Sequence, residues 1–310
     1  MSFYNKLNRL NLNDKTSEGV TMVTYSKNHL KLHIFGENDI EGLLSLSQSI
    51  GWDYDRSDIQ TILSCGKIFG HKNELGQIVS SAAIIPYDTD LASIGMVIVN
   101  PGYRGQGLGK DTTKACIDSV SAQTSIMLIA TPEGKPMYEK MGFKVVDDVH
   151  KFICMNYVPS DGFPDEGLKA EVLQDDEFEK VFELDKFAFG DFRRKFLTNR
   201  IKQSHQSLVL KNEMGDVLGF GLSVLGPCHL LLGPIVAPND RAAAYLLHQL
   251  ALNHKGKLRI DLPARNERFM NHLRNSGFEK VSQPPVMIIH SDSMPTRNSH
   301  LYGIAAQVFG

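Results

Sequence analysis

Residues 97–110 read Val97-Ile98-Val99-Asn100-Pro101-Gly102-Tyr103-Arg104-Gly105-Gln106-Gly107-Leu108-Gly109-Lys110. The apolar start is typical of a buried strand, and the residues after the turn have the apolar spacing of an amphipathic helix. Gly105, Gly107 and Gly109 lack the Cβ atoms that would keep a phosphate from the backbone, and the N–H groups at a helix start attract anions. The pattern predicts a strand, a phosphate-binding turn and a helix, in that order.

The same glycines have two other interpretations. The turn of a Rossmann dinucleotide site also follows a strand, but its glycines are spaced G-x-G-x-x-G, whereas these alternate as G-x-G-x-G behind Arg104. A tight turn without any ligand is the plainer interpretation, and the turn alone leaves it open. The strand before the turn and the helix after it favour a phosphate site.

Similar elements occur twice along the chain, about 138 residues apart. A strand-like run follows Gly76 in the first half and Gly215 in the second half. A helix-like stretch closes on Gly142-Phe143 and again on Gly277-Phe278. A chain of 310 residues is also about twice the length of a typical domain. We therefore expect two copies of one fold.

The boundary between the copies is expected at residues 159–167, which are rich in turn-forming residues. This places one domain at residues 25–158 and the other at residues 168–310. In the first domain, strand-like runs cover residues 29–35, 77–85, 91–99, 126–130 and 151–155, and helix-like runs cover residues 39–49, 53–64, 107–121 and 132–141. Short turns, rather than helices, separate the middle strands, so a purely parallel sheet fits poorly. We expect an α/β fold with a mixed sheet.

Composition and charge argue against several classes of protein. The chain has 33 basic and 35 acidic side chains and a net charge of −2, so it provides no general field for attracting nucleic acid. No apolar run approaches the roughly 20 residues of a membrane helix, and the polar start does not resemble a secretory signal. The cysteines lack the spacing of a metal or redox motif: Cys65, Cys116, Cys154 and Cys228. We expect a cytoplasmic protein with no metal, membrane or nucleic-acid partner.

Two segments of the first half together resemble a known family. Residues 104–109 resemble the acyl-CoA signature, R/Q-x-x-G-x-G/A, of the GNAT N-acetyltransferase superfamily. Residues 136–143, with Tyr138 shortly before Gly142-Phe143, resemble that family's second landmark. With the repeat, the whole chain resembles a tandem-GNAT protein. The resemblance implies direct transfer of an acetyl group from acetyl-CoA to a primary amine of a small molecule, amino acid or peptide.

The resemblance also implies roles for particular residues. The backbone of Met96, Val97 and Val99 is expected to pair with the pantetheine arm, with the Val97 N–H stabilising the oxyanion. Tyr138 is expected to protonate the departing thiolate, because a phenol with a pKa near 10 is matched to that task, although a core aromatic is the alternative. The expected pyrophosphate contacts are Arg104, Gly105, Gln106, Gly107, Leu108, Gly109 and Lys110.

The sequence indicates the residues that bind the acceptor amine less clearly. Ser93 stands where several family members place a glutamate base, and a serine is not an efficient base at neutral pH, so the base is unassigned. Residues 51–58 lie where the resemblance places the acceptor, with Asp53 or Ser57 as an alternative helix cap. The acceptor residues expected on this basis are Trp52, Asp53, Tyr54, Asp55 and Ser93.

The second half departs further from the family pattern. Residues 236–244 replace the phosphate turn with a segment that lacks glycine and contains Asp240, and Leu273 stands where the first half has Tyr138. We expect this half to shape the acceptor pocket without binding cofactor, with residues 291–310 folding across the cleft. A fragment of residues 1–160 is then expected to bind cofactor but to lose transfer activity.

Other activities stay open on the sequence. An acyl-CoA-binding regulatory or sensor protein without efficient catalysis is the alternative from a different class. A longer acyl group, or an oxygen or sulfur acceptor, also fits the motif.

Overall fold

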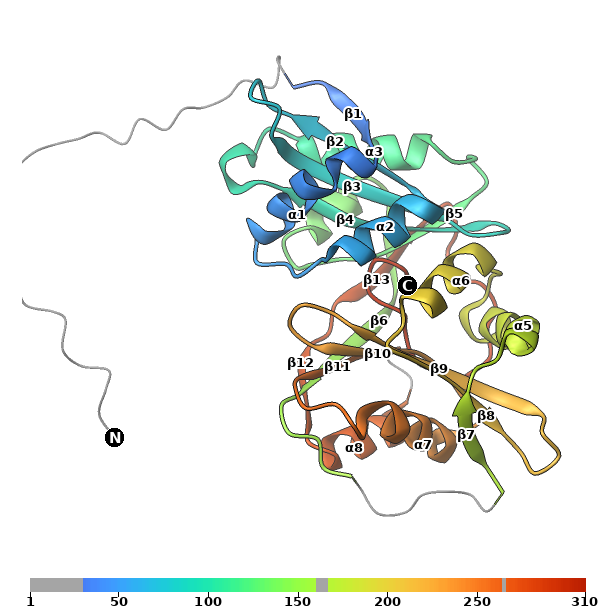
Figure 1. Cartoon of the computed structure of the whole chain (residues 1–310). Helices are drawn as coiled ribbons and strands as arrows, with labels where there is room; N and C mark the ends of the chain where they lie inside the picture. The colour runs from blue at the N-terminus through green and yellow to red at the C-terminus, as the bar shows by residue number, and fades with distance from the viewer. Residues whose placement is uncertain (1–29, 160–166, 264–265) are drawn as a thin grey trace, which may run out of the picture.

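The computed structural model describes residues 30–159, 167–263 and 266–310. It shows two α/β lobes, one from each half of the chain, that share a sheet (Figure 1). The expected linker lies mainly in residues 160–166, and the expected start of the first domain lies at residues 25–29, both outside the described residues. No helix in the described part of the chain is long and apolar enough to cross a membrane.

The first half of the chain contains the expected elements in the expected order. Its strands are β1 (Leu32–Phe35), β2 (Lys67–Lys72), β3 (Ile78–Pro86), β4 (Leu91–Val99), β5 (Ser125–Ile129) and β6 (Lys144–Cys154). Its helices are α1 (Ile40–Gln48), α2 (Arg56–Cys65), α3 (Leu108–Asp118) and α4 (Lys135–Lys140), with 3-10 turns η2 (Glu37–Asp39) and η3 (Pro101–Tyr103). The sequence pattern does not predict β2, and β6 begins well before the expected residue 151.

The second half of the chain repeats this order and adds strands at its end. Its strands are β7 (Lys169–Val172), β8 (Gln206–Lys211), β9 (Val217–Leu225), β10 (Leu230–Val236), β11 (Leu258–Pro263), β12 (Phe278–Ser282), β13 (Pro285–Ile289) and β14 (Leu301–Gly303). Its helices are α5 (Phe178–Phe189), α6 (Arg194–Gln203), α7 (Asp240–Ala251) and α8 (Glu267–Asn275), with 3-10 turn η4 (Asp175–Glu177). The pairs β4–β5 and β10–β11 are parallel and the other pairs are antiparallel, so the α/β fold with a mixed sheet is confirmed.

The two halves exchange a strand. β13, from the second half, pairs with β5 on one side and with residues 144–148 of β6 on the other. The rest of β6, residues 149–154, leaves the first lobe and lies between β11 and β12 of the second. The exchange joins both lobes into one continuous sheet. Each lobe therefore contains a strand that the other half of the chain supplies.

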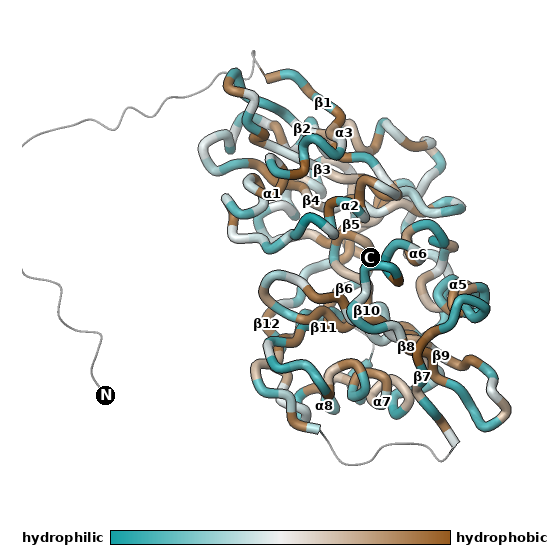
Figure 2. The backbone as a smooth tube through the Cα atoms, viewed as in Figure 1, coloured by the Kyte–Doolittle hydropathy of each residue, from teal (hydrophilic) through white to brown (hydrophobic). Residues whose placement is uncertain are grey.

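Helices cover both faces of the sheet in the first lobe, which explains why β3 and β4 are buried along most of their length. Helix α2 also packs against α6 of the second half. One hydrophobic cluster crosses this contact, and it includes Ile59, Ile62, Phe196 and Phe309. In Figure 2 the inner strands β9, β10 and β11 are apolar and the peripheral loops are hydrophilic. The halves thus share core as well as sheet.

The end of the chain lies between the lobes (Figure 1). Its first part, β14, pairs with β10 of the second lobe. Further along, Ser93 Oγ of β4 donates a hydrogen bond of 2.9 Å to the Val308 carbonyl oxygen. A Cβ at Gly95 would lie 2.8 Å from Val308 Cα, so only glycine leaves room for the chain here. Residues 301–310 therefore connect the second lobe to the middle of the first lobe's sheet.

Candidate active site

Strands β4 and β5 pair over only part of their length. Leu91–Ile94 pairs with Ser125–Leu128, and among the described strands none pairs with Met96–Val99 on the β5 side. A register shift against β3 and a φ of 52° at Met96 mark a bulge here. A positive φ outside glycine is uncommon and often occurs at functional sites. The bulge takes backbone groups near Met96 out of the regular ladder, beside the gap in the sheet.

The glycine turn that follows β4 leads into an uncapped helix. Gly105 and Gly107 have φ values of 78° and 80°, in the left-handed region that favours glycine. Helix α3 has no side-chain cap, so the N–H groups of its first turn, Leu108–Lys110, have no intrahelical partner. The side chains of Arg104 and Lys110 are exposed. N–H donors at the positive end of a helix, flanked by two exposed cations, fit a pyrophosphate.

Helix α3 begins close to both β4 and α4. A Cβ at Gly109 would lie 3.4 Å from Val99 Cγ2 and 3.5 Å from Met137 Sδ. The side-chain carbonyl oxygen of Gln106 is buried and makes no hydrogen bond with the described residues. The predicted phosphate turn, the end of β4 and the helix that carries Tyr138 therefore form one contiguous region.

Tyr138 is buried and lies against the loop between β5 and α4. Its side chain is 6% exposed, and its ring meets Phe143 edge-on with centroids 5.8 Å apart. A Cβ at Gly134 would lie 2.9 Å from the Tyr138 ring and 3.4 Å from Thr131 Oγ1. Burial raises the pKa of the Tyr138 phenol, so the phenol keeps its proton through the neutral range.

The equivalent region of the second half is already filled. Asn239 Oδ1 caps α7 by accepting a hydrogen bond of 2.9 Å from the Ala242 N–H. Asp240 Oδ1 accepts hydrogen bonds from Asn266 Nδ2 (2.9 Å) and Tyr302 Oη (3.0 Å). Strand β14 pairs with the end of β10, the counterpart of the open edge of β4. In the second half, a capping side chain thus occupies the start of α7 and β14 occupies the edge of β10, the counterparts of the uncapped start of α3 and the open edge of β4.

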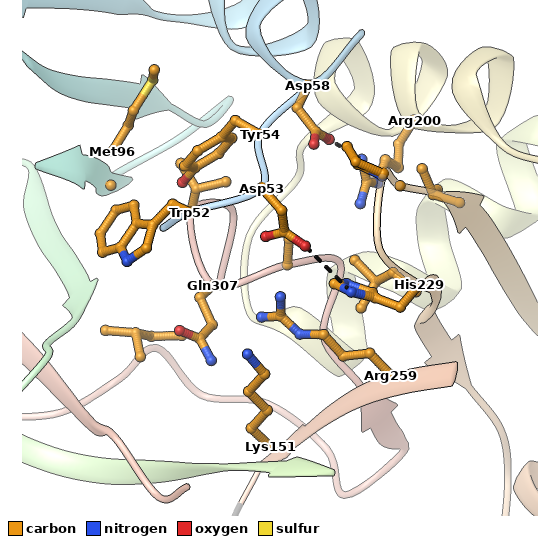
Figure 3. Close-up of a pocket in the computed structure, with 18 of the residues that line it drawn as sticks. Trp52, Asp53, Tyr54, Asp58, Met96, Lys151, Arg200, His229, Arg259 and Gln307 are labelled. Atoms are coloured by element: carbon orange, nitrogen blue, oxygen red, sulfur yellow. Dashed lines mark hydrogen bonds and ion pairs between the residues drawn. The ribbon is translucent and has the colours of Figure 1, made fainter. Parts of the chain in front are cut away.

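A cavity of about 190 Å³ lies between the halves (Figure 3). Its wall comes from the α1–α2 loop, α2, β4, β5, the β5–α4 loop, β6, α6, β9, the β9–β10 loop, β10, β11 and the end of the chain. The lining includes Trp52, Asp53, Tyr54, Asp58, Met96, Thr131, Lys151, Arg200, His229, Arg259 and Gln307. Because both the Met96 bulge and Thr131 are part of this wall, the cavity reaches the gap between β4 and β5.

The cavity wall carries charges of both signs. Arg200 Nη1 donates a hydrogen bond of 3.1 Å to Asp58 Oδ1. Asp53 Oδ2 lies 3.3 Å from His229 Nδ1 (Figure 3). Burial and then the charge of Arg259 lower the pKa of His229 to about 4, although Asp53 acts in the opposite direction. The imidazole is therefore neutral at physiological pH, and the carboxylate favours the tautomer that leaves the lone pair on Nε2.

Comparisons with known proteins agree on one family. Models described as an acetyltransferase (GNAT) domain match residues 64–159 and residues 181–303. The chain is also 34% identical over 282 residues to the uncharacterized N-acetyltransferase YitH of Bacillus subtilis, which covers 91% of this chain and 98% of that protein. The chain belongs to the GNAT acetyltransferase family. It is a tandem member, with one GNAT domain in each half.

Solved structures share the tandem fold. A proposed acetyltransferase from Pyrococcus horikoshii superposes with a TM-score of 0.76 at 20% identity, covering 99% of this chain and 100% of that chain. A tandem GNAT protein from the clavulanic acid biosynthesis pathway gives a TM-score of 0.65 at 15% identity, covering 85% of this chain and 99% of that chain. At these identities the likeness concerns the fold alone.

The GNAT chain brings only some of the expected acceptor residues to the cavity. Trp52, Asp53 and Tyr54 line it. Asp55 instead caps α2, its Oδ1 accepting a hydrogen bond of 2.8 Å from the Asp58 N–H, so the cap is neither of the two residues considered from the sequence. Ser93 is fully buried and bonded to the end of the chain. Neither Asp55 nor Ser93 is among the lining residues.

Several polar groups of the cavity are not predicted by the sequence analysis. Lys151 comes from the exchanged part of β6, and His229 and Arg259 come from the second GNAT domain. No local motif connects them with residues near position 53. One signal was available, because Arg259 and Asp261 interrupt an otherwise apolar strand, and buried strands rarely carry charge without a partner or a function.

Proposed function

We propose that the first half binds acetyl-CoA and transfers its acetyl group to a primary amine held in the cavity between the halves. The observation that carries this proposal is the gap between β4 and β5, which has the uncapped helix α3 at one end and the cavity at the other. Cofactor and acceptor would approach from opposite faces of the sheet and meet at the Met96 bulge. The second half, closed by Asn239 and β14, would bind no cofactor.

Acetyl-CoA would supply an activated acetyl group as a thioester. The N–H groups of residues 105–110 would hold its pyrophosphate, with Arg104 and Lys110 adding positive charge. The backbone at Met96, Val97 and Val99 would align the pantetheine arm, and an N–H at the bulge would stabilise the oxyanion. As the carbon–nitrogen bond forms and the carbon–sulfur bond breaks, Tyr138 would donate its proton to the sulfur.

The amine proton needs an acceptor, and Ser93 does not provide one because it is buried and bonded to Val308. His229 lines the cavity as a neutral imidazole beside Asp53. We assign the base to His229 Nε2, with Asp53 holding the ring in the required tautomer. The pair joins the two halves, because Asp53 belongs to the first GNAT domain and His229 to the second.

Release of free thiol from acetyl-CoA across a panel of amines tests the function. A transferase releases thiol in proportion to the amount of acetylated amine, whereas a sensor that only binds acyl-CoA releases none with any member of the panel. Mass spectrometry of the product identifies whether nitrogen, oxygen or sulfur has received the group. Parallel reactions with longer acyl-CoA thioesters establish the chain length that the site accepts.

Calorimetry is expected to give one coenzyme A site per chain. Gly107→Glu together with Gly109→Glu should weaken binding at least 100-fold, because two carboxylates would meet the pyrophosphate and position 107 requires a positive φ. Lys110→Ala should weaken binding several-fold, whereas Lys114→Ala, one helical turn further on and paired with Asp118, should not. Two equivalent sites per chain would contradict the proposal.

His229→Gln is expected to lower kcat about 100-fold or more, the usual range for loss of a general base. Because the folded-state pKa of His229 is about 4, the neutral form predominates above that pH, so the wild type should keep its rate well below pH 6.5. His205→Gln, at an exposed histidine of the same domain, is the matched control. Equal kcat values for both variants would remove His229 from the mechanism.

A further inference from the structure

Two cations lie together on one wall of the cavity. Lys151 of β6 stands directly opposite Asp261 of β11 in the antiparallel ladder, and Arg259 is two residues from Asp261 on the same strand. Residues two apart share a face of a sheet, so the three side chains project to the same side. Figure 3 shows the Lys151 ammonium, the Arg259 guanidinium and the Gln307 amide gathered in one part of the cavity. All three groups are hydrogen-bond donors.

Among the residues that the structure describes, only Arg259 of these two cations has an ion-pair partner. Arg259 Nε and Nη2 donate to Asp261 Oδ2, at 3.1 and 2.5 Å, and no hydrogen bond from Nη1 reaches any residue of the described ranges. Within the described residues the Lys151 ammonium forms no ion pair or hydrogen bond. Burial, followed by the charge of Arg259, lowers the pKa of Lys151. An anion between the two side chains would satisfy both and relieve their repulsion.

The charge balance indicates what the rest of the ligand carries. His229 is neutral, so the cavity lining and its direct ion-pair partners hold equal numbers of positive and negative groups among the described residues: Lys151, Arg200 and Arg259 against Asp53, Asp58 and Asp261. A purely anionic ligand would leave excess negative charge in a partly buried site, which is costly. A ligand with one charge of each sign preserves the balance. Its cationic end would face Asp53 and His229.

The size of the cavity restricts the ligand further. Its volume of about 190 Å³ is below the roughly 300–1,000 Å³ of pockets for drug-sized ligands. Trp52, Ile129 and Leu231 provide apolar surface in the same wall. A single amino acid has the necessary size, the two opposite charges and an apolar side chain for this surface.

We infer that the acceptor is a free amino acid, whose carboxylate binds between Lys151 and Arg259 while its amine faces Asp53, His229 and the Met96 bulge. This inference rests on the proposed function for the transfer step, but the carboxylate site itself does not depend on turnover. Gln307, from the end of the chain, would donate a further hydrogen bond to the carboxylate. Lys151 and Arg259 are thus specificity-determining residues.

Trp52 provides a direct readout of occupancy, because it is the only tryptophan in the sequence and it lines the cavity. The full-length protein is titrated with each of the twenty amino acids, with and without coenzyme A, while Trp52 emission is recorded. The amino acid that binds best is then compared with its carboxamide and with the amine that lacks the carboxylate. We expect Kd to be about 10- to 100-fold lower for the amino acid, the range for hydrogen bonds to charged groups.

Variants of two lysines on β6 test the contact between Lys151 and the ligand carboxylate. Lys151→Met should remove most of the preference for the carboxylate, and Lys151→Glu should reverse it in favour of the amine without a carboxylate. The matched control is Lys144→Met, at an exposed lysine of the same strand that pairs with Asp292, and it should leave all affinities unchanged. Arg259 is kept in all variants, because it is the ion-pair partner of the buried Asp261 carboxylate, and removing one member of a buried ion pair is strongly destabilising.

Three results would overturn the inference: no amino acid changes Trp52 emission, the three related ligands bind equally, or Lys151→Met behaves like Lys144→Met. Failure of the proposed function has a different signature. In that case no amine releases thiol from acetyl-CoA, while Trp52 emission still reports a carboxylate preference that depends on Lys151. Conversely, thiol release with amines that lack a carboxylate at rates equal to those with amino acids supports the transferase and refutes the amino-acid acceptor.

Discussion

A fragment of residues 1–160 is expected to lose both its fold and its affinity for coenzyme A. The sequence alone predicts that such a fragment retains the cofactor site. In the structure, however, β13 of the second half lies between β5 and β6 and pairs with both. Without β13, the inner edges of β5 and β6 expose unpaired backbone groups, and residues 149–154 of β6 have no sheet to join. The α2 face also loses its contact with α6.

Circular dichroism and thermal unfolding of the fragment test this expectation. We expect no cooperative unfolding transition for residues 1–160 alone, because cooperative folding requires the buried contacts that the other half supplies. Co-expression of residues 1–160 with residues 161–310 is the matched control, since it restores every contact except the covalent link. The two fragments should copurify and recover coenzyme A binding. A fragment that unfolds cooperatively and binds coenzyme A as tightly as the full chain would show that each lobe folds independently.

Much of the fold follows from local sequence patterns. The alternating glycines, the apolar strand before them and the recurrence of landmarks at a constant separation led to two α/β copies, and the structure confirms this class. The strand exchange does not follow from local sequence patterns. Residues Pro285–Ile289 of β13 are mostly apolar, but hydrophobicity does not specify the sheet that a strand joins. That choice depends on the whole molecule, through the pairing of β13 with β5 and β6.

The residues of the candidate site also fall into two groups, those that a local sequence pattern predicts and those that only the packing of the two halves brings together. Residues that act through a local turn, such as Gly105 and Gly107, have a recognisable spacing, and their left-handed φ values give it a physical reason. The loop with Trp52 was expected near the acceptor and does line the cavity. His229 and Arg259 approach that loop only through the packing of two halves, so no spacing in the sequence relates them to it.

Tyr138→Phe is expected to lower kcat about 10²–10⁴-fold with little change in coenzyme A affinity. The substitution removes one hydroxyl, and general acid catalysis is typically worth a factor of this size. The ring contact with Phe143 would persist, and the glycine turn and the β4 backbone are untouched, so folding and binding should be preserved. The measurements are steady-state turnover with a good acceptor, coenzyme A calorimetry and thermal unfolding.

A packing role for Tyr138 predicts a different result, in which the phenylalanine variant keeps its turnover and only Tyr138→Ala causes harm, through stability. Tyr157→Phe is the matched control, because burial raises the pKa of Tyr157 to about 12 and its Oη lies 3.1 Å from His248 Nδ1. The pH dependence adds a second test. Because burial raises the pKa of Tyr138, the wild type should lose rate only above pH 10, as the phenol ionises, and Tyr138→Phe should lack that loss. Wild-type turnover in Tyr138→Phe would leave the thiolate to be protonated by another group.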